Sequence, residues 1–490
     1  MNTQDWKGLR AQHLIGGAMH DGDPATGRFE SFAPVGGESL GSAPRGGVAE
    51  ARAAIAAARK VFESTPWRDA PRQRASALLE LAMRLEADAK PLAELLNVEN
   101  GKLLRECAGE VESSVSELRY YAGLARLGAG RVIEPMPGVR SLITQEAAGV
   151  TAIIVPWNAP LVLFIRSLAP ALAAGCTVVV KAAPQVALFM YRVATHLAAV
   201  TQMPAGTVNL VFEDGHAVAQ EFVRSSDVDV LSYTGSTAVG KRIMADAAGT
   251  LKRLSLELGG KAPCVVLDDA NLATAVPQIL AASTILSGQQ CTAATRVLVQ
   301  RPLRAAFEEA MAQAMRAFRV GPGHLASSDM GSLIDLPNRD RVLRLLDEIE
   351  VAGHRFVVRG GAVAGLPANG AFVSPSLVVV EDAHSPVVQN EHFAPLLTLE
   401  TFDSDRDGVA LANITRFGLG SSVWSRDHAR AQRLAKEIRC GTVWINAHNK
   451  FFAEAESGGY RDSGFGRLHG LEGLRDFVQT KHVYEEIGVL

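Results

Sequence analysis

Three residue types able to do chemistry on a carbonyl stand out in this sequence. Cys291 lies in the run GQQCTAATR, thirty-four positions after Glu257 of LELGG, and Asn158 ends the upstream tripeptide PWN. A thiolate attacks as a nucleophile where its site is partly exposed and electropositive. A carboxylate can activate water, and an amide N–H can hold an oxyanion. Together the three residues indicate acyl chemistry.

Each of these residues alone would be weak evidence of catalysis. A single free cysteine in an apolar chain is more often a small core residue than a nucleophile. The joint occurrence of a thiol, a base and an amide donor therefore favours catalysis over simple burial.

Length and composition limit what the chain can be. With 490 residues, 48% of them hydrophobic and 21% charged, it is expected to be a soluble globular protein of two or three domains. The net charge is −3, and the basic groups are balanced locally by acidic ones, so a nucleic-acid partner is not expected. The sequence has no apolar run of about eighteen residues and no signal peptide, so no membrane partner is expected.

The cysteines and histidines argue against cross-links and metals. Five cysteines form no C-x-x-C pair and leave an odd number, which favours a reducing cytoplasm over a disulfide framework. The histidines are scattered without ligand spacing, so no metal site is expected.

Periodicity predicts how the chain positions these groups. The N-terminal third is expected to be mainly helical, with helices over 48–63, 71–89 and 91–123, and 131–149 reads as an extended ribbon. From Val150 short β-branched runs alternate with helical stretches, which predicts a parallel sheet covered on both faces.

A second α/β series begins near Ala262 and predicts a second domain. The terminal stretch 481–489 alternates like a strand but has no evident partner nearby, so another subunit is a candidate partner.

The run YTGSTAVG at 233–240 lies where a predicted strand meets a helix. Its glycines would let a phosphate approach the free N–H groups of the helix, although a glycine pair is equally typical of an ordinary turn. Lys181, at the end of TVVVK, could reach a ribose or a phosphate, or could be an ordinary surface lysine.

Seven ordered motifs make the chain resemble the NAD(P)-dependent aldehyde dehydrogenases along nearly its whole length. They are PWN at 156–158, the strand ending at 181, YTGSTAVG at 233–240, LELGGK at 256–261, GQQC at 288–291, NEHFAP at 390–395 and SGFGR at 463–467. The resemblance implies an α/β fold in which a Rossmann-like cofactor domain is joined to an α/β catalytic domain and a small β oligomerisation arm.

The resemblance also implies roles for single residues. Cys291 would be the nucleophile, Glu257 the base for deacylation, and Asn158 with the Cys291 N–H the oxyanion site. The cofactor-binding positions would be Val155, Pro156, Trp157, Lys181, Gly215, Thr234, Gly235, Ser236, Leu258, Glu391 and Phe393.

The resemblance also implies domains that are built from separate segments of the chain. Residues 1–125 and 148–258 would form the NAD(P)-binding domain, 259–455 the catalytic domain, and 126–147 with 471–490 the oligomerisation arm of a homodimer or homotetramer.

Two positions near the cofactor motifs depart from the family pattern. Pro184 stands where many NAD-dependent relatives place a ribose-binding glutamate, so NAD is expected but NADP is not barred. Ala394 replaces a usual glycine.

The substrate passage is expected to follow one face of the helix that starts after Asn158. On that face Arg166 could bind a carboxylate or a polar aromatic ring, or could pair with an internal acid. Arginine there resembles both the succinic-semialdehyde members and the vanillin- or salicylaldehyde-type members, and PWNAP is closer to the latter. The expected lining is Val162, Leu163, Arg166, Gln290, Thr292, Lys450 and Phe451.

The resemblance thus implies that the small-molecule substrate is an aldehyde, which would be oxidised to the acid. Two alternatives stay open: a coenzyme A-acylating semialdehyde dehydrogenase, whose members commonly lack the glutamate, and a noncatalytic binding or structural protein on the same fold. The presence of Glu257 argues against the first, and the intact trio of Cys291, Glu257 and Asn158 argues against the second.

Overall fold

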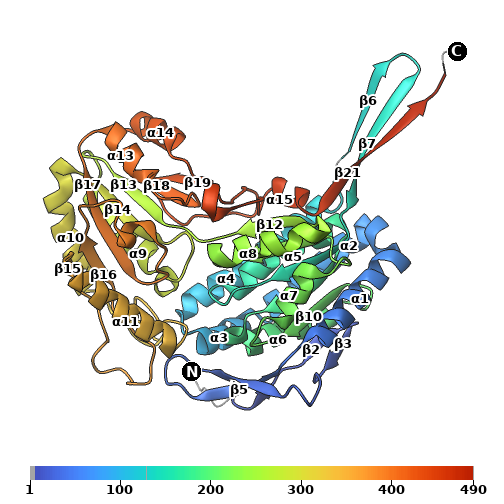
Figure 1. Ribbon diagram of the computed structural model, residues 1–490, viewed down its shortest axis with the longest axis horizontal. Helices are drawn as coiled ribbons and strands as arrows, with labels where there is room; N and C mark the ends of the chain where they lie inside the picture. Colours follow the sequence, from blue (N-terminus) through green and yellow to red (C-terminus); the bar gives the residue numbers. More distant parts are fainter. Residues whose placement is uncertain (1–5, 129, 489–490) are drawn as a thin grey trace.

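Two large sheets organise the protein, each inside its own lobe (Figure 1). The computed structural model describes residues 6–128 and 130–488. The expected α/β fold with a Rossmann-like sheet is confirmed.

The first sheet has eight strands in the order β20-β12-β11-β8-β9-β10-β2-β3, and its five central strands are parallel. These strands are runs of β-branched and apolar residues buried on both faces, as a covered parallel sheet requires. The central strands are β8 (Val150–Ile154), β9 (Thr177–Ala182), β10 (Val208–Phe212), β11 (Val230–Thr234) and β12 (Arg253–Glu257).

Helices cover the two faces of this sheet as two separate apolar cores. One core joins the sheet to α2 (Pro71–Ala87), α3 (Ala89–Asn100), α4 (Leu104–Leu124), α5 (Pro160–Ala174) and α6 (Ala187–Ala198). The other joins it to α1 (Val48–Ser64), α7 (Ala217–Arg224) and α8 (Thr237–Ala247). The expected helix over 91–123 is in fact two helices, because Gly101 adopts the left-handed φ of 83° and ends α3.

The expectation that the N-terminal third is mainly helical is wrong for its first part. Residues 9–44 contain five short strands: β1 (Leu9–Arg10), β2 (His13–Ile15), β3 (Ala18–His20), β4 (Arg28–Phe32) and β5 (Ser39–Pro44). Strand β2 extends the large sheet antiparallel to β10, while β1, β5 and β4 form a small sheet of their own. Strands of two to six residues depend on distant partners rather than on local periodicity.

The second sheet has seven strands in the order β15-β16-β17-β14-β13-β18-β19, all parallel except the edge strand β15. Its strands are β13 (Ala262–Val266), β14 (Ala294–Gln300), β15 (Arg355–Val358), β16 (Ser376–Val379), β17 (Leu396–Phe402), β18 (Gly420–Trp424) and β19 (Thr442–Ile445). The helices around it are α9 (Leu272–Thr284), α10 (Arg304–Arg316), α11 (Leu336–Val351), α12 (Pro386–Gln389), α13 (Asp405–Ala412) and α14 (His428–Glu437).

A three-stranded arm projects from the first lobe (Figure 1). Strands β6 (Arg131–Met136) and β7 (Val139–Ala147) form the expected ribbon, and β21 (Val478–Glu486) pairs antiparallel with β7. The terminal strand therefore has its partner in its own chain, which corrects the expectation that it lacks one. The two partners are too far apart in the sequence for a local pattern to match them.

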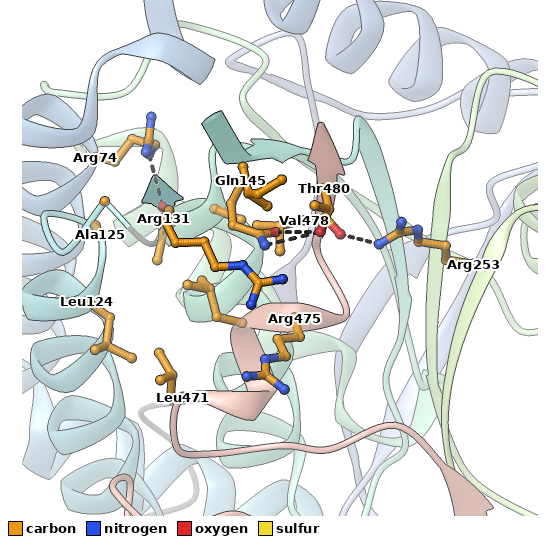
Figure 2. Close-up of a pocket in the computed structure, with 16 residues that line it drawn as sticks. Arg74, Leu124, Ala125, Arg131, Gln145, Arg253, Leu471, Arg475, Val478 and Thr480 are labelled. Atoms are coloured by element: carbon orange, nitrogen blue, oxygen red, sulfur yellow. Dashed lines mark hydrogen bonds between the residues drawn. The ribbon is translucent and has the colours of Figure 1, made fainter. Parts of the chain in front are cut away.

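The base of the arm is anchored beside a cavity of about 640 Å³ (Figure 2). The guanidinium of Arg253 at the start of β12 donates to the carbonyl oxygen of Val478, the first residue of β21. On the wall of the same cavity, within the first lobe, Arg74 donates to the carbonyl of Ala173 near the end of α5. The remaining short elements nearby are β20 (Gly464–Phe465) and α15 (Glu472–Arg475).

Candidate active site

A crevice for a ligand arises where the connections of the first sheet change direction. From β8 the chain moves to β9 and β10 on one side, then returns to β11 and β12 on the other. Loops leaving the carboxyl ends of β8 and β11 therefore diverge, and ligands of open α/β sheets bind at such switch points. The segment 155–158 leaves β8 here, and 235–236 leaves β11.

Asn158 is held in this crevice by buried polar contacts. Its side-chain Nδ2 donates to the carbonyl oxygen of Gln289 at 2.9 Å, and its own carbonyl accepts from Lys102 Nζ at 3.1 Å. The preceding carbonyl, of Trp157, accepts from Asn100 Nδ2 at 2.7 Å. The amide of Asn158 is thus fixed, and it retains a second N–H for another acceptor.

A buried ion pair supports the same segment. Lys102 is paired with Glu110, and both side chains are almost fully buried. The other oxygen of Glu110 accepts the backbone N–H groups of Leu161 at 2.6 Å and Val162 at 3.3 Å, at the start of α5. A carboxylate favours this positive end of a helix. The pair therefore fixes both Asn158 and the direction of α5.

Glu257 is the last residue of β12 and is buried, with 5% of its surface exposed. Its Oε1 has no hydrogen-bond partner in the described chain. Burial raises the pKa of this carboxyl to about 7, although the charges of Arg166 and Arg467 oppose that rise. A carboxyl with this pKa can exchange a proton near neutral pH.

Cys291 lies in the turn between α9 and β14, where Ala293 N donates to the Gln290 carbonyl at 3.0 Å. Of the five cysteines it alone is only partly buried. Burial of the thiol raises its pKa to about 11, with Arg166 acting in the opposite direction and Glu257 in the same one. The thiol therefore needs a base to ionise at neutral pH.

One cavity of about 510 Å³ brings the expected chemistry together. Asn158, Glu257 and Cys291 all line it. Of the expected passage residues, it is also lined by Val162, Leu163, Arg166, Gln290, Thr292 and Phe451. Lys450 is not among the lining residues: its side chain is exposed, and its carbonyl accepts from Trp444 Nε1.

Arg166 is a buried cation on the α5 wall of this cavity, 8% exposed. It forms no ion pair within the described chain, and its Nε has no hydrogen-bond partner there. Its one side-chain hydrogen bond in the described chain is a long one of 3.3 Å from a terminal nitrogen to Thr234 Oγ1. No acid of the described residues forms an ion pair with it, although Glu257 on the same cavity is near enough for the two charges to interact.

The cavity also contains carboxylates that the sequence did not single out. Glu106 and Glu110 are bound to backbone N–H groups, whereas Glu112 and Glu454 are exposed. The buried part of the cavity wall thus contains Arg166, and the exposed part contains Glu112 and Glu454.

The expected cofactor positions gather at the carboxyl ends of the parallel strands of the first sheet. Val155 N donates to the Lys181 carbonyl at 3.0 Å, and Gly215 follows β10 with open space around its α-carbon. Ser236 is the exposed N-cap of α8, and its Oγ accepts from Val239 N. Burial lowers the pKa of Lys181, which the nearby Glu213 and Asp214 partly offset. An exposed helix start can accommodate a phosphate.

Residues of the second lobe face these positions. Phe393 takes the left-handed φ of 52°, and its ring meets that of Trp157 edge-on at 5.6 Å. Glu391 Oε1 accepts the N–H of Gly260 at 3.1 Å. Leu258 packs against Gly240 of α8, where a Cβ would come within 2.5 Å of the leucine side chain. Pro184 opens a short 3₁₀ turn after β9 and supplies no carboxylate.

Comparison with known proteins identifies the family. Residues 22–483 match the profile described as the aldehyde dehydrogenase family. The chain belongs to that family. This aldehyde dehydrogenase is therefore an oxidoreductase, which confirms the enzyme class predicted from its motifs.

Its relatives match over nearly their full length. A betaine aldehyde dehydrogenase of Bacillus subtilis is 37% identical over 455 residues, 92% of each chain. A glutarate-semialdehyde dehydrogenase of Pseudomonas aeruginosa is 34% identical over 485 residues, 99% of each chain. The crystal structure of betaine aldehyde dehydrogenase from Staphylococcus aureus in complex with NAD+ superposes with a TM-score of 0.96 at 32% identity, covering 100% of this chain and 97% of that one.

The residues that the structure describes contain neither a membrane-spanning helix nor a metal-binding cluster. None of their helices is both long and apolar enough to span a bilayer. They also contain no group of three or more histidine, cysteine or acidic residues that could hold a metal ion.

Several residues that shape the site were not predicted from the sequence. They are Asn100, Lys102 and Glu110, which hold the segment 157–162, and His448, which contacts the nucleophile turn. The only available signal was a polar residue in an apolar pattern, and such a signal does not reveal a distant partner.

The raised pKa of Glu257 predicts a pH-dependent stability. Its pKa of about 7 in the fold exceeds the ordinary value of 4.5, so the fold disfavours the charged form. The stability present below pH 4.5 is lost as the pH rises through 7, by at most about 3 kcal/mol. We expect Glu257→Gln to unfold at a higher denaturant concentration than the parent at pH 8. The difference between the two unfolding midpoints should shrink toward pH 5.

Glu112→Gln is the matched control, because that exposed carboxylate lies in the same cavity in contact with water. It should give no pH-dependent gap. A constant gap for Glu257→Gln at all pH values would contradict the proposed burial of its charge.

Proposed function

We propose that this protein oxidises an aldehyde to the carboxylic acid with NAD(P)+ through a thioester on Cys291, which water activated by Glu257 then hydrolyses. The single observation that carries the proposal is one cavity lined by the Cys291 thiol, the Glu257 carboxyl and the Asn158 amide.

The first step makes a carbon–sulfur bond. Water in the cavity takes the proton of the Cys291 thiol and passes it to solvent, an ionisation that the charge of Arg166 favours, and the thiolate attacks the aldehyde carbon. The carbonyl oxygen becomes negative and accepts hydrogen bonds from the second Asn158 N–H and the Cys291 backbone N–H. One such donor lowers a barrier by about 3 kcal/mol.

The second step oxidises the carbon. The nicotinamide of the bound cofactor accepts the hydride, and the tetrahedral carbon becomes the carbonyl of a thioester. Glu257 then takes a proton from water, hydroxide attacks the thioester, and the Cys291 thiolate leaves as the acid is released. Glu257 suits this proton transfer because burial brings its pKa to about 7.

We propose NAD as the cofactor, held by the positions that the sequence indicated. The exposed start of α8 at Ser236 and the lysine at the end of β9 fit its phosphates and ribose. Trp157 and Phe393 would flank the nicotinamide, and Glu391 would bind its ribose. Glu213 and Asp214 near Lys181 disfavour the extra phosphate of NADP, even though Pro184 brings no carboxylate. The NAD+ complex of the staphylococcal relative supports this proposal.

The division into domains is part of the same proposal. The eight-stranded sheet with its helices would be the cofactor domain, the seven-stranded sheet the catalytic domain, and β6, β7 and β21 the oligomerisation arm.

For the substrate, we propose an aldehyde with an anionic or hydroxylated group, such as a carboxylated or aromatic one, held by Arg166. A buried guanidinium without a paired acid attracts such a group and disfavours a quaternary ammonium. The similarity to a glutarate-semialdehyde dehydrogenase is compatible with this, whereas the similarity to betaine aldehyde dehydrogenases is outweighed by the charge of Arg166.

The proposed chemistry predicts contrasting losses for two variants. Cys291→Ala should abolish NADH formation and leave cofactor binding within a few-fold, because only the nucleophile is removed. Glu257→Gln in the presence of excess aldehyde should give about one NADH per site and then a slow phase, because deacylation is blocked after hydride transfer. Absorbance at 340 nm in a stopped-flow instrument measures both.

The alternatives are separated in the same assay. Substantial turnover by Cys291→Ala would reject the mechanism. Acceleration of the parent by coenzyme A, with a thioester product, would favour the acylating class, and no turnover of any aldehyde by the parent would favour the noncatalytic protein.

Arg166→Ala should lose about ten- to a hundredfold in kcat/KM for 4-carboxybenzaldehyde, because a charge-assisted hydrogen bond of about 1.5 to 3 kcal/mol is removed. Benzaldehyde should lose much less. The ratio of the two losses is the readout, since Arg166 also lowers the pKa of Cys291 and that effect is shared by both substrates. Equal losses would leave Arg166 a structural or electrostatic role only.

We expect the protein to be a homodimer or homotetramer. The arm exposes apolar side chains, among them Val132, Ile133 and Tyr484, and a small projecting sheet is marginal in water by itself. Light scattering at micromolar concentration should give at least twice the chain mass, and Ile133→Asp should lower it. A monomeric parent would contradict the assembly.

A further inference from the structure

His448 is a buried residue that the proposed chemistry does not use, although it lies against the nucleophile turn. It follows β19 in the loop that carries Phe451 to the cavity, and only 6% of its surface is exposed. Its Nε2 lies 2.9 Å from the carbonyl oxygen of Thr292, the residue after Cys291. Its Nδ1 lies 3.0 Å from Ser422 Oγ, and its ring packs against Trp444 at 4.8 Å.

The partners of His448 determine its tautomer. A carbonyl oxygen can only accept, so Nε2 carries the proton that is donated to Thr292. Trp424 Nε1 donates to Ser422 Oγ at 2.9 Å, and Ser422 in turn donates its hydroxyl proton to Nδ1 of His448. The Sγ of Cys264 lies 3.6 Å from the same ring nitrogen. Burial lowers the pKa of the ring to about 4, so this neutral form holds at physiological pH. Each donor and acceptor in the chain from Trp424 to Thr292 is satisfied.

This arrangement excludes His448 as the base for Cys291. A histidine beside a cysteine nucleophile often takes its proton. Here both ring nitrogens are engaged, one as the donor to a carbonyl and the other as the acceptor from a hydroxyl. The ring therefore has no free nitrogen for the thiol.

The contact of His448 with Thr292 instead helps to hold the nucleophile turn in place. Within it, Ala293 N donates to the Gln290 carbonyl at 3.0 Å. Gly260 approaches so closely that a Cβ there would lie 2.2 Å from the carbonyl oxygen of Cys291. His448 binds the next carbonyl, that of Thr292. The peptide before Cys291 and the two peptides after it thus have fixed neighbours.

We propose that His448 is a positioning residue, which with Ser422 and Trp424 holds the carbonyl of Thr292, one residue beyond the nucleophile, so that the sulfur and the Cys291 N–H point at the same carbonyl group of the substrate. The inference rests on the proposed function of Cys291. Displacement of a reacting group by 1 Å costs on the order of a hundredfold in rate, so loss of this hold should be visible in kcat.

Two isosteric variants separate the two hydrogen bonds of the ring. His448→Gln places an amide N–H near the position of Nε2 and keeps the bond to Thr292, while His448→Asn keeps only the bond to Ser422. We expect His448→Asn to lose at least about tenfold in kcat and His448→Gln to stay within about threefold of the parent. The KM for NAD and the melting temperature should be similar in the two variants.

A second readout reports on the nucleophile itself. The rate of Cys291 alkylation by iodoacetamide, followed by mass spectrometry, should fall in His448→Asn and recover in His448→Gln. His354→Asn is the matched control, because His354 is half-buried and its Nε2 contacts Ser385 Oγ at 3.2 Å outside the cavity. It should leave both rates unchanged.

Three outcomes are decisive. A parental kcat and alkylation rate in His448→Asn would overturn the inference while leaving the thioester mechanism intact. Equal losses in both variants that follow their melting temperatures would reduce His448 to a structural residue. Turnover in Cys291→Ala would instead show that the proposed function itself fails.

Discussion

The site depends on a crossing of four residues, 258–261, that carries the chain from the last parallel strand of one sheet to the first strand of the other. This crossing must pass between the nucleophile turn and Glu391 with almost no room for side chains. A Cβ on Gly259 would lie 2.2 Å from Glu391 Oε2, and one on Gly260 would lie equally close to the Cys291 carbonyl. The two glycines therefore set the distance between the lobes. Glu257, directly before the crossing, is brought into the cavity by the same constraint.

Buried charge is distributed around this crossing in two different ways. Lys102 and Glu110 neutralise each other and bind backbone groups, so their charges position Asn158 and α5 without acting on a substrate. Arg166 and Glu257 line the cavity without being paired to each other, and each alters the proton affinity of the groups around it. A paired charge in a protein interior fixes structure, whereas an uncompensated one costs stability and is typical of a functional site.

The sequence predicted those parts of the fold and of the site that depend on local residue patterns. The central strands and helices of the first sheet follow from β-branched runs and helical periodicity, and the residues at the carboxyl ends of parallel strands follow from that topology. Cys291, Glu257 and Asn158 were predicted as one group and lie on one cavity. Local patterns could not reveal the short strands of residues 9–44, the contact of Lys102 with Asn158, or that of His448 with Thr292, since each joins segments far apart in the chain. Lys450 was expected in the passage, but its loop turns the side chain toward solvent.

The pairing of β21 with β7 has a consequence for how the protein is made. During synthesis β6 and β7 emerge early, while β21, the third strand of their sheet, follows only after the strands of both large sheets. Until then the ribbon has two strands, which is marginal in water, although the first lobe can already begin to fold around its parallel sheet. While both lobes are being synthesised, the arm is therefore an incomplete ribbon, and only the synthesis of Val478–Glu486 turns it into a three-stranded sheet.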